Sequence, residues 1–316
     1  MSTTAAASNR PLPLPHGDRE GPLVARGEGR GEGAAPQPQT AVPHRIHLTH
    51  AQAPLTREVE VRDEYGATRL IHIPAERPLT IFVDKRELVT LMTLGMAPEL
   101  LVLGYLLNQR LVPGASSIEA ISVDWDVAAA AVTTRSGIRT ERTATRTVTT
   151  GCGQGTVFGA LMDSIGDVHL PDPQSARISQ RAVYTMLETM RAADSVYKRA
   201  GSVHGCALFQ GEHTLLHVED VGRHNAIDTI AGWMALQGVR GGDKAFYTTG
   251  RLTSEMVMKA AQMGVPIIVS RNGITQMGYE LAVRLGITLF GRARNRHFIC
   301  YCGFERFDAD PAEVRA

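Results

Sequence analysis

Few cysteines, a nearly balanced charge and the lack of long apolar runs distinguish this chain of 316 residues. The four cysteines, at 152, 206, 300 and 302, are too scattered to suggest the disulfide framework of a small secreted protein. A formal net charge of +1 gives no bulk attraction to nucleic acid or to a membrane surface, so an anion site must be local. No stretch approaches the roughly 18 apolar residues of a membrane span, and the N-terminus has no apolar signal core. We therefore expect a cytoplasmic protein with neither a membrane nor a nucleic acid as partner.

Several catalytic signatures are also missing. There is no Walker lysine loop and no Gly-x-Gly-x-x-Gly after a strand. A zinc-dependent base deaminase would need His-x-Glu followed by Pro-Cys-x-x-Cys, and His204-Gly205-Cys206 has no glutamate. His213 and His217 flank a strand-like run, in which four residues span about 13 Å, too far for one metal. Cys300 and Cys302 share a strand face but have no evident third ligand, so we expect no metal held by protein side chains.

Composition divides the chain into parts. An apolar content of 43% fits a globular protein with a substantial core. Residues 1–50 are rich in Pro, Gly, Arg and Ala, and we interpret them as a disordered tail, with a basic docking arm as the alternative. Beyond it we expect a strand-rich N-terminal subdomain over 51–150, a glycine-rich cysteine loop over 151–173, and an α/β domain over 174–308.

Periodicity predicts the elements of the N-terminal part. Ordered structure should begin near Arg57, with strands at 57–61, 79–83, 120–124 and 128–133. Asp84-Lys85 should form a turn, and the apolar run 98–108, which starts with a proline, is typical of a helix. The Thr- and Arg-rich ribbon 139–149 suggests an extended, exposed hairpin arm.

The C-terminal part alternates between helix and strand. Apolar spacing predicts one helix over 179–200 that ends at Gly201, then strands 206–209 and 214–218 joined by a turn at Gly211-Glu212. Further helices are expected at 225–237, 253–263 and 275–285, and further strands at 244–248, 265–270, 287–290 and 297–301. This alternation predicts a largely parallel sheet with helices on both faces.

Cys152 lies among glycines in Thr150-Gly151-Cys152-Gly153-Gln154-Gly155. The preceding arginines are Arg135, Arg139, Arg142 and Arg146. Positive charge favours a thiolate over a thiol, so this residue is a candidate reactive thiol; a free cysteine in a flexible loop is the alternative.

Two polar segments fall where strands meet helices, the edge at which open α/β sheets bind ligands. In the stretch 218–228, Arg223, His224 and Asn225 would open a helix whose free N–H groups suit a phosphate. The residues alone favour a capping network instead, in which Asp220 or Asn225 accepts backbone hydrogens and Arg223 pairs with Glu219.

The second segment, 291–297, lies between two strands and contains three arginines and a histidine. Guanidinium groups match phosphate geometry, so this segment is either a site for a pyrophosphate-bearing ligand or a solvated hairpin tip.

The strings Glu219-Asp220-Val221-Gly222-Arg223-His224-Asn225-Ala226-Ile227-Asp228 and Gly250-Arg251-Leu252-Thr253-Ser254-Glu255-Met256 resemble the FdhD family of formate dehydrogenase accessory sulfurtransferases. The similarity continues through 265–270 and 288–294 to Tyr301 and covers roughly residues 57–307.

The resemblance implies a cytidine-deaminase-like three-layer α/β/α domain, without zinc chemistry, in a homodimer. It implies that Cys152 accepts sulfur as a persulfide from a cysteine desulfurase. The sulfur would be delivered to the bis(molybdopterin guanine dinucleotide) molybdenum cofactor, a bound substrate, before its insertion into formate dehydrogenase. The family's cofactor-binding segment matches Arg292, Ala293, Arg294, Asn295, Arg296 and His297.

The chain departs from the family pattern at Gly155, which stands where the family loop usually has a second cysteine. A lone thiol on a glycine hinge can still attack a persulfide donor, so the single carrier is retained. Two alternatives remain open: a chaperone that binds the guanine dinucleotide without moving sulfur, and a nucleotide-binding enzyme on a deaminase-like sheet.

Overall fold

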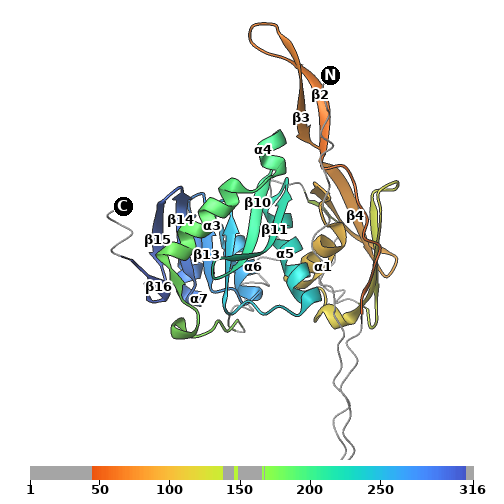
Figure 1. Cartoon of the computed structure of the whole chain (residues 1–316). Helices are drawn as coiled ribbons and strands as arrows, with labels where there is room; N and C mark the ends of the chain where they lie inside the picture. The colour runs from red at the N-terminus through yellow and green to blue at the C-terminus, as the bar shows by residue number, and fades with distance from the viewer. Residues whose placement is uncertain (1–44, 138–145, 149–165, 167, 311–316) are drawn as a thin grey trace, which may run out of the picture. The chain divides into compact units, whose positions relative to one another are not determined.

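The computed structural model describes residues 45–137, 146–148, 166 and 168–310 (Figure 1). By its contacts the chain divides into two units, Met1–Val42 and Pro43–Ala316, and all that follows concerns the second. Most of the predicted tail, Cys152 and most of the ribbon 139–149 lie outside the described residues.

The first sheet has the strand order β1-β6-β7-β4-β5-β8. Its strands are β1 (His47–Leu48), β4 (Arg77–Val83), β5 (Arg86–Thr93), β6 (Ile118–Asp124), β7 (Ala129–Thr134) and β8 (Arg146–Val148). Alternate side chains of β4, those of Leu79, Ile81 and Val83, are buried in a core shared with helix α1 (Pro98–Asn108). The turn predicted at Asp84-Lys85 is confirmed, with φ of 47° and 68° at the two residues of the β4–β5 hairpin.

Sequence periodicity missed some elements of this part. Strands β3 (Thr68–Pro74) and β5 were not predicted; β3 forms a separate two-stranded sheet with β2 (Thr56–Arg62). Ordered structure also begins before Arg57, because Ile46 joins the core and β1 pairs with β6. Strand β1 has only two residues and carries no readable period, so the sequence pattern could not predict this early start.

The second sheet has the order β11-β10-β12-β13-β14-β15. Its strands are β10 (His204–Gln210), β11 (His213–Asp220), β12 (Lys244–Thr248), β13 (Ile267–Ser270), β14 (Thr288–Arg294) and β15 (His297–Cys302). The expectation of a largely parallel sheet is wrong. Only the β12–β13 and β13–β14 pairings are parallel, because hairpins turn β11 and β15 back along their neighbours and β10 runs against β12.

Helices cover both faces of this mixed sheet, as predicted. Helix α3 (Gln180–Ala192) crosses one face and packs on Phe209 and Tyr247 (Figure 1). Strand neighbours such as Phe246 point to the other face. That side is covered by α5 (Arg223–Gln237), which packs on β10 and β11, followed by α6 (Ser254–Gln262) and α7 (Gln276–Leu285).

The single helix predicted over 179–200 is two helices. Helix α3 ends where Ala193 turns to an extended conformation (ψ 134°), and α4 (Val196–Ala200) begins after Ser195. The Ser195 hydroxyl accepts the Lys198 N–H, and Glu219 accepts the N–H groups of the first α4 residues. These capping contacts favour a new helix start over continuation, which apolar spacing alone does not reveal.

Helices α1 and α5 cross at unusually short distance. A Cβ added to Gly104 of α1 would lie 1.7 Å from the Asp228 carbonyl oxygen, and one on Gly232 of α5 would lie 2.0 Å from the Leu100 carbonyl oxygen. Glycine is therefore required on both helices.

The remaining elements are short. They are η1 (Ala115–Ser117), η4 (Pro173–Ser175), β9 (Ile178–Ser179), η5 (Phe304–Arg306) and β16 (Phe307–Asp308), with β9 and β16 paired in parallel. Among the described residues, no helix combines the length and the apolar character needed to cross a bilayer.

Candidate ligand-binding cavity at the sheet edge

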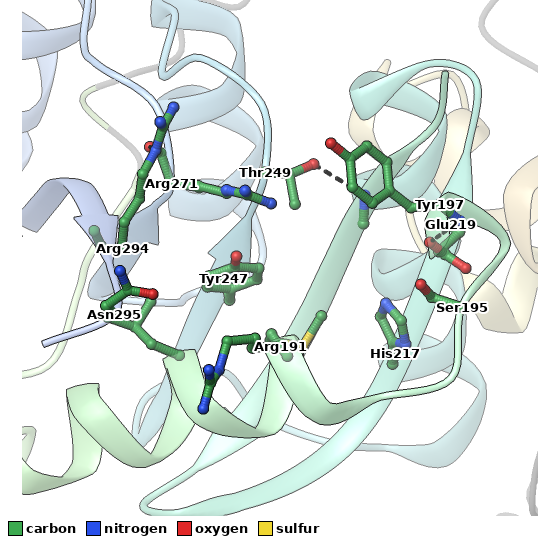
Figure 2. A pocket seen from close by; sticks show the side chains of 14 residues that line it. Arg191, Ser195, Tyr197, His217, Glu219, Tyr247, Thr249, Arg271, Arg294 and Asn295 are labelled. Atoms are coloured by element: carbon green, nitrogen blue, oxygen red, sulfur yellow. Dashed lines mark hydrogen bonds between the residues drawn. The ribbon is translucent and has the colours of Figure 1, made fainter. Parts of the chain in front are cut away.

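The parallel strands β12, β13 and β14 end at one edge of the second sheet, and a cavity of about 210 Å³ opens there (Figure 2). Tyr247 and Thr249 reach it from the end of β12, Arg271 follows β13, and Arg294 closes β14. Helix α3 and the start of α4 supply the opposite wall. The cavity thus lies where α/β sheets commonly bind ligands.

Three arginines give this cavity a positive wall. Figure 2 shows Arg271 and Arg294 near Tyr247, with Arg191 of α3 below them. None of the three forms an ion pair with a carboxylate among the described residues. Within the described part of the chain, Arg294 Nε donates a hydrogen bond to the Arg271 carbonyl oxygen at 3.4 Å. Unpaired guanidinium groups around a small cavity suit a phosphate or pyrophosphate.

Glu219, the one carboxylate among the described residues that line the cavity, does not neutralise these arginines. Glu219 accepts the Val196 N–H at 2.5 Å and the Tyr197 N–H at 3.1 Å, so it caps helix α4. Next to it, His217 has a buried Nε2 with no described partner, and burial lowers its pKa against the opposing effect of Glu219. Burial raises the pKa of Tyr247 to about 12, so its phenol stays protonated. At neutral pH this wall therefore offers an imidazole and a phenol as uncharged hydrogen-bonding groups.

The structure brings three of the six predicted cofactor-binding residues into the cavity wall: Ala293, Arg294 and Asn295. Ala293 is 1% exposed and its methyl group packs with the α3 core, so it gives the wall shape rather than charge.

The other three residues of the segment do not line the cavity. Arg292 is exposed with φ of 52°, Arg296 lies over the Tyr184 ring at 5.0 Å, and His297 opens β15. A β-bulge between Gly291 and Arg294 separates these side chains.

Sequence reasoning missed several cavity residues, among them Arg191, Arg271 and His217. Arg271 had a readable signal, because it directly follows a short apolar strand at the ligand-binding edge. The sequence carries no such signal for Arg191 and His217, because their positions at the cavity depend on how α3 and β11 pack.

The capping network that the residues favoured for the string 219–228 forms only in part: Asp220 accepts backbone N–H groups, but no side chain caps the first turn of α5. Asp220 accepts the backbone N–H groups of Gly222 at 3.0 Å and Leu94 at 3.1 Å, and the Asn225 amide at 2.8 Å. Burial raises the pKa of Asp220 to about 6, although these hydrogen bonds oppose the shift. The predicted pairing of Arg223 with Glu219 is not formed, because Glu219 caps α4 instead.

Comparison with known proteins identifies the relatives of this chain. Residues 74–308 match the model of the FdhD/NarQ family. The chain belongs to that family. Sulfur carrier protein FdhD of Listeria innocua is 28% identical over 256 residues, covering 80% of this chain and 98% of the relative. Sulfur carrier protein FdhD of Bacillus subtilis is 30% identical over 233 residues, covering 73% and 88%.

A solved structure supports the same conclusion. A candidate formate dehydrogenase accessory protein from Desulfotalea psychrophila has a TM-score of 0.67 and 27% identity, covering 80% of this chain and 100% of that one. The mixed α/β fold is therefore that of an FdhD-type protein, and the closer likeness to cytidine deaminases stays a prediction.

Cysteines matter in a family whose relatives are named sulfur carriers. Cys206 is fully buried and donates to the Thr248 hydroxyl at 3.2 Å, and burial raises its pKa to about 12. Burial also raises the pKa values of Cys300 and Cys302 to about 11 each. All three are protonated, poorly nucleophilic thiols at neutral pH. Cys152 lies outside the described residues.

Among the residues that the structure describes, no three His, Cys, Asp or Glu side chains are grouped so that they could hold a metal ion. His213 and His217 do lie on a strand, β11, as predicted.

Proposed function

We propose that this member of the FdhD/NarQ family is a sulfur carrier whose persulfide forms on Cys152. The sulfur would come from a cysteine desulfurase and go to the bis(molybdopterin guanine dinucleotide) molybdenum cofactor destined for formate dehydrogenase. The relatives are named sulfur carriers, and the Desulfotalea psychrophila protein is described as a formate dehydrogenase accessory protein.

The observation that carries the proposal is the state of the other three cysteines. A sulfur carrier needs a thiolate, and burial holds Cys206, Cys300 and Cys302 in the thiol form. Cys152 is the remaining cysteine of the chain, and it is framed by glycines and preceded by four arginines.

The transfer step needs no oxidant. The Cys152 thiolate attacks the outer sulfur of the donor's persulfide, the donor's S–S bond breaks, and the donor leaves as a thiolate. Cys152 then holds the sulfur as a persulfide. Because Gly155 replaces the second loop cysteine, one thiol receives the sulfur and also releases it.

The cavity at the sheet edge supports the second half of the proposal. Unpaired Arg271 and Arg294 suit the pyrophosphate of a guanine dinucleotide, while His217 and Tyr247 offer hydrogen bonds to its uncharged parts. We assign the segment 292–297 to the same ligand, with Arg294 and Asn295 inside the cavity. A cytoplasmic homodimer is part of this proposal.

Replacing one thiol tests the carrier role. Cys152→Ser should leave the fold intact and abolish formate dehydrogenase activity in a complementation assay, because a hydroxyl cannot form a persulfide. The matched control Cys300→Ser removes a half-buried thiol from strand β15 and should retain activity. Full activity of Cys152→Ser would favour a cofactor-binding chaperone that moves no sulfur.

A further inference from the structure

A second group of cations lies at the same sheet edge, outside the cavity described above. Arg223 opens helix α5, and Arg251 follows strand β12. Neither forms an ion pair or hydrogen bond with another described residue, and the Arg223 Nε is buried without a partner. The Arg223 side chain lies against Gly250, where an added Cβ would approach its Cδ to 2.6 Å. The missing Cβ at Gly250 thus leaves the space that this side chain occupies.

The two guanidinium groups repel each other. Burial lowers the pKa of Arg223, and the charge of Arg251 lowers it further. His204, at the start of β10, shares this environment: burial, then Arg223 and Arg251, lower its pKa. The carboxylate that partly offsets the charge on Arg223 is Glu255.

Glu255 is shared with a buried lysine, whose Nζ lies 3.8 Å away. The neutral His224 imidazole, with its Nδ1 at 3.6 Å, adds no charge. Positive charge therefore accumulates at Arg223 and Arg251, beside His204, without a dedicated counterion among the described residues. An uncompensated, half-buried cation costs free energy unless an anion pairs with it.

This cluster is distinct from the cavity but adjacent to it. Arg223 belongs to the helix that packs on one face of the sheet, whereas the cavity is lined by α3 on the other. Thr249 connects them, because it lines the cavity and its hydroxyl lies 3.4 Å from the His204 Nδ1.

We propose that Arg223, Arg251 and His204 form a second binding site for a phosphate-type oxyanion. The guanidinium groups supply charge and paired N–H donors, and the neutral imidazole supplies one further hydrogen bond. The site goes beyond the proposed function, since it exists whether or not the cavity binds a guanine dinucleotide. Two oxyanion sites on one sheet edge would accept a ligand that carries two separate phosphate groups.

Calorimetric titration with inorganic pyrophosphate at constant ionic strength tests this inference. The wild-type protein should bind two equivalents. Arg251→Gln, an exposed substitution that should preserve the fold, should weaken one of the two by at least tenfold. The double variant Arg271→Gln/Arg294→Gln should lose the other equivalent, and Arg284→Gln on the exposed side of α7 should keep both.

The two proposals fail separately in this design. If Arg251→Gln still binds two equivalents with wild-type affinity, the second site does not exist. If the Arg271→Gln/Arg294→Gln double variant still binds two equivalents with wild-type affinity, the cavity is not a phosphate site.

Thermal unfolding gives an independent readout. Without ligand, the melting temperature of Arg251→Gln should be no lower than that of wild type, because the substitution removes a repulsion. Pyrophosphate should raise the melting temperature of Arg251→Gln less than that of wild type. A lower melting temperature in the ligand-free variant would contradict the unpaired-charge argument.

Discussion

At the scale of single residues, His224 is a buried imidazole held in its neutral form. It lies in the first turn of α5, with a side chain 12% exposed, and its Nδ1 faces Glu255 at 3.6 Å. Burial lowers its pKa to about 2, and the charges of Lys259 and Arg223 add to the effect. The nearby carboxylate does not outweigh desolvation and two cations.

This shift makes the free energy of unfolding depend on pH. The unfolded chain binds a proton at His224 near pH 6.5, and the folded chain does not until about pH 2. The contribution to the free energy of unfolding is therefore complete above about pH 6.5 and falls as the pH falls, by about 2 kcal/mol at pH 5. Urea denaturation should show that His224→Gln loses about 2 kcal/mol less than wild type between pH 7.5 and pH 5.

The control for this experiment is His213→Gln, at an exposed position that opens β11. Its stability should fall with acid as much as that of wild type. Equal acid losses in His224→Gln and wild type would show that His224 is not held neutral.

At the scale of elements, the crossing of α1 and α5 joins the helix of the first sheet to a helix of the second. Gly104 permits the close approach, and Asn108 of α1 donates to the Asp228 carboxylate of α5 at 2.7 Å. Lys259 of α6 donates to the same carboxylate at 2.8 Å, so one buried acid links three helices. Removing one partner from such a buried group is strongly destabilising.

Gly104→Ala tests the packing of this crossing. Alanine favours a helix by about 1 kcal/mol over glycine, so a helix free of contacts would be stabilised. Here the added methyl would overlap the Asp228 carbonyl oxygen, and we expect a net destabilisation of about 2 kcal/mol or more by urea denaturation. Gly273→Ala, where an added Cβ meets nothing within 4 Å, should change stability by less than about 0.5 kcal/mol. A stabilised Gly104→Ala would mean that the helices cross less closely.

Elements with a clear period were predictable from sequence. The helix at 98–108 has the predicted bounds, and the strands around Gly211-Glu212 form the expected hairpin. The break at Ala193 and the direction of β10 were not predictable, because a cap from Glu219 and the pairing with β12 decide them.

The candidate site was also predictable only where the sequence itself carries a signal. Arg294 and Asn295 stood in a conspicuous basic segment, whereas Arg191 and His217 enter the cavity only through packing. The like-charged pair Arg223 and Arg251 comes from two separate strings, 219–228 and 250–256, which the sheet edge brings together.

At the scale of the whole molecule, the proposed sulfur-carrying thiol and the proposed phosphate sites belong to separate parts of the chain. Thiols on β10 and β15 are held protonated by burial, and the proposed function assigns sulfur transfer to the thiol of Cys152. The proposals assign the phosphate groups of the sulfur acceptor to the sheet edge, with its cavity and its second cation cluster. This division assigns no transfer role to Cys206, Cys300 or Cys302.

Mass spectrometry of the purified protein after incubation with a cysteine desulfurase and cysteine tests this division most directly. A variant in which Cys206, Cys300 and Cys302 are replaced by Ala or Ser, with Cys152 retained, should gain one sulfur atom, on the peptide that contains Cys152. Cys152→Ser should gain none. Sulfur found on the peptide that contains Cys300 and Cys302 in Cys152→Ser, or none on the folded triple variant, would contradict the account.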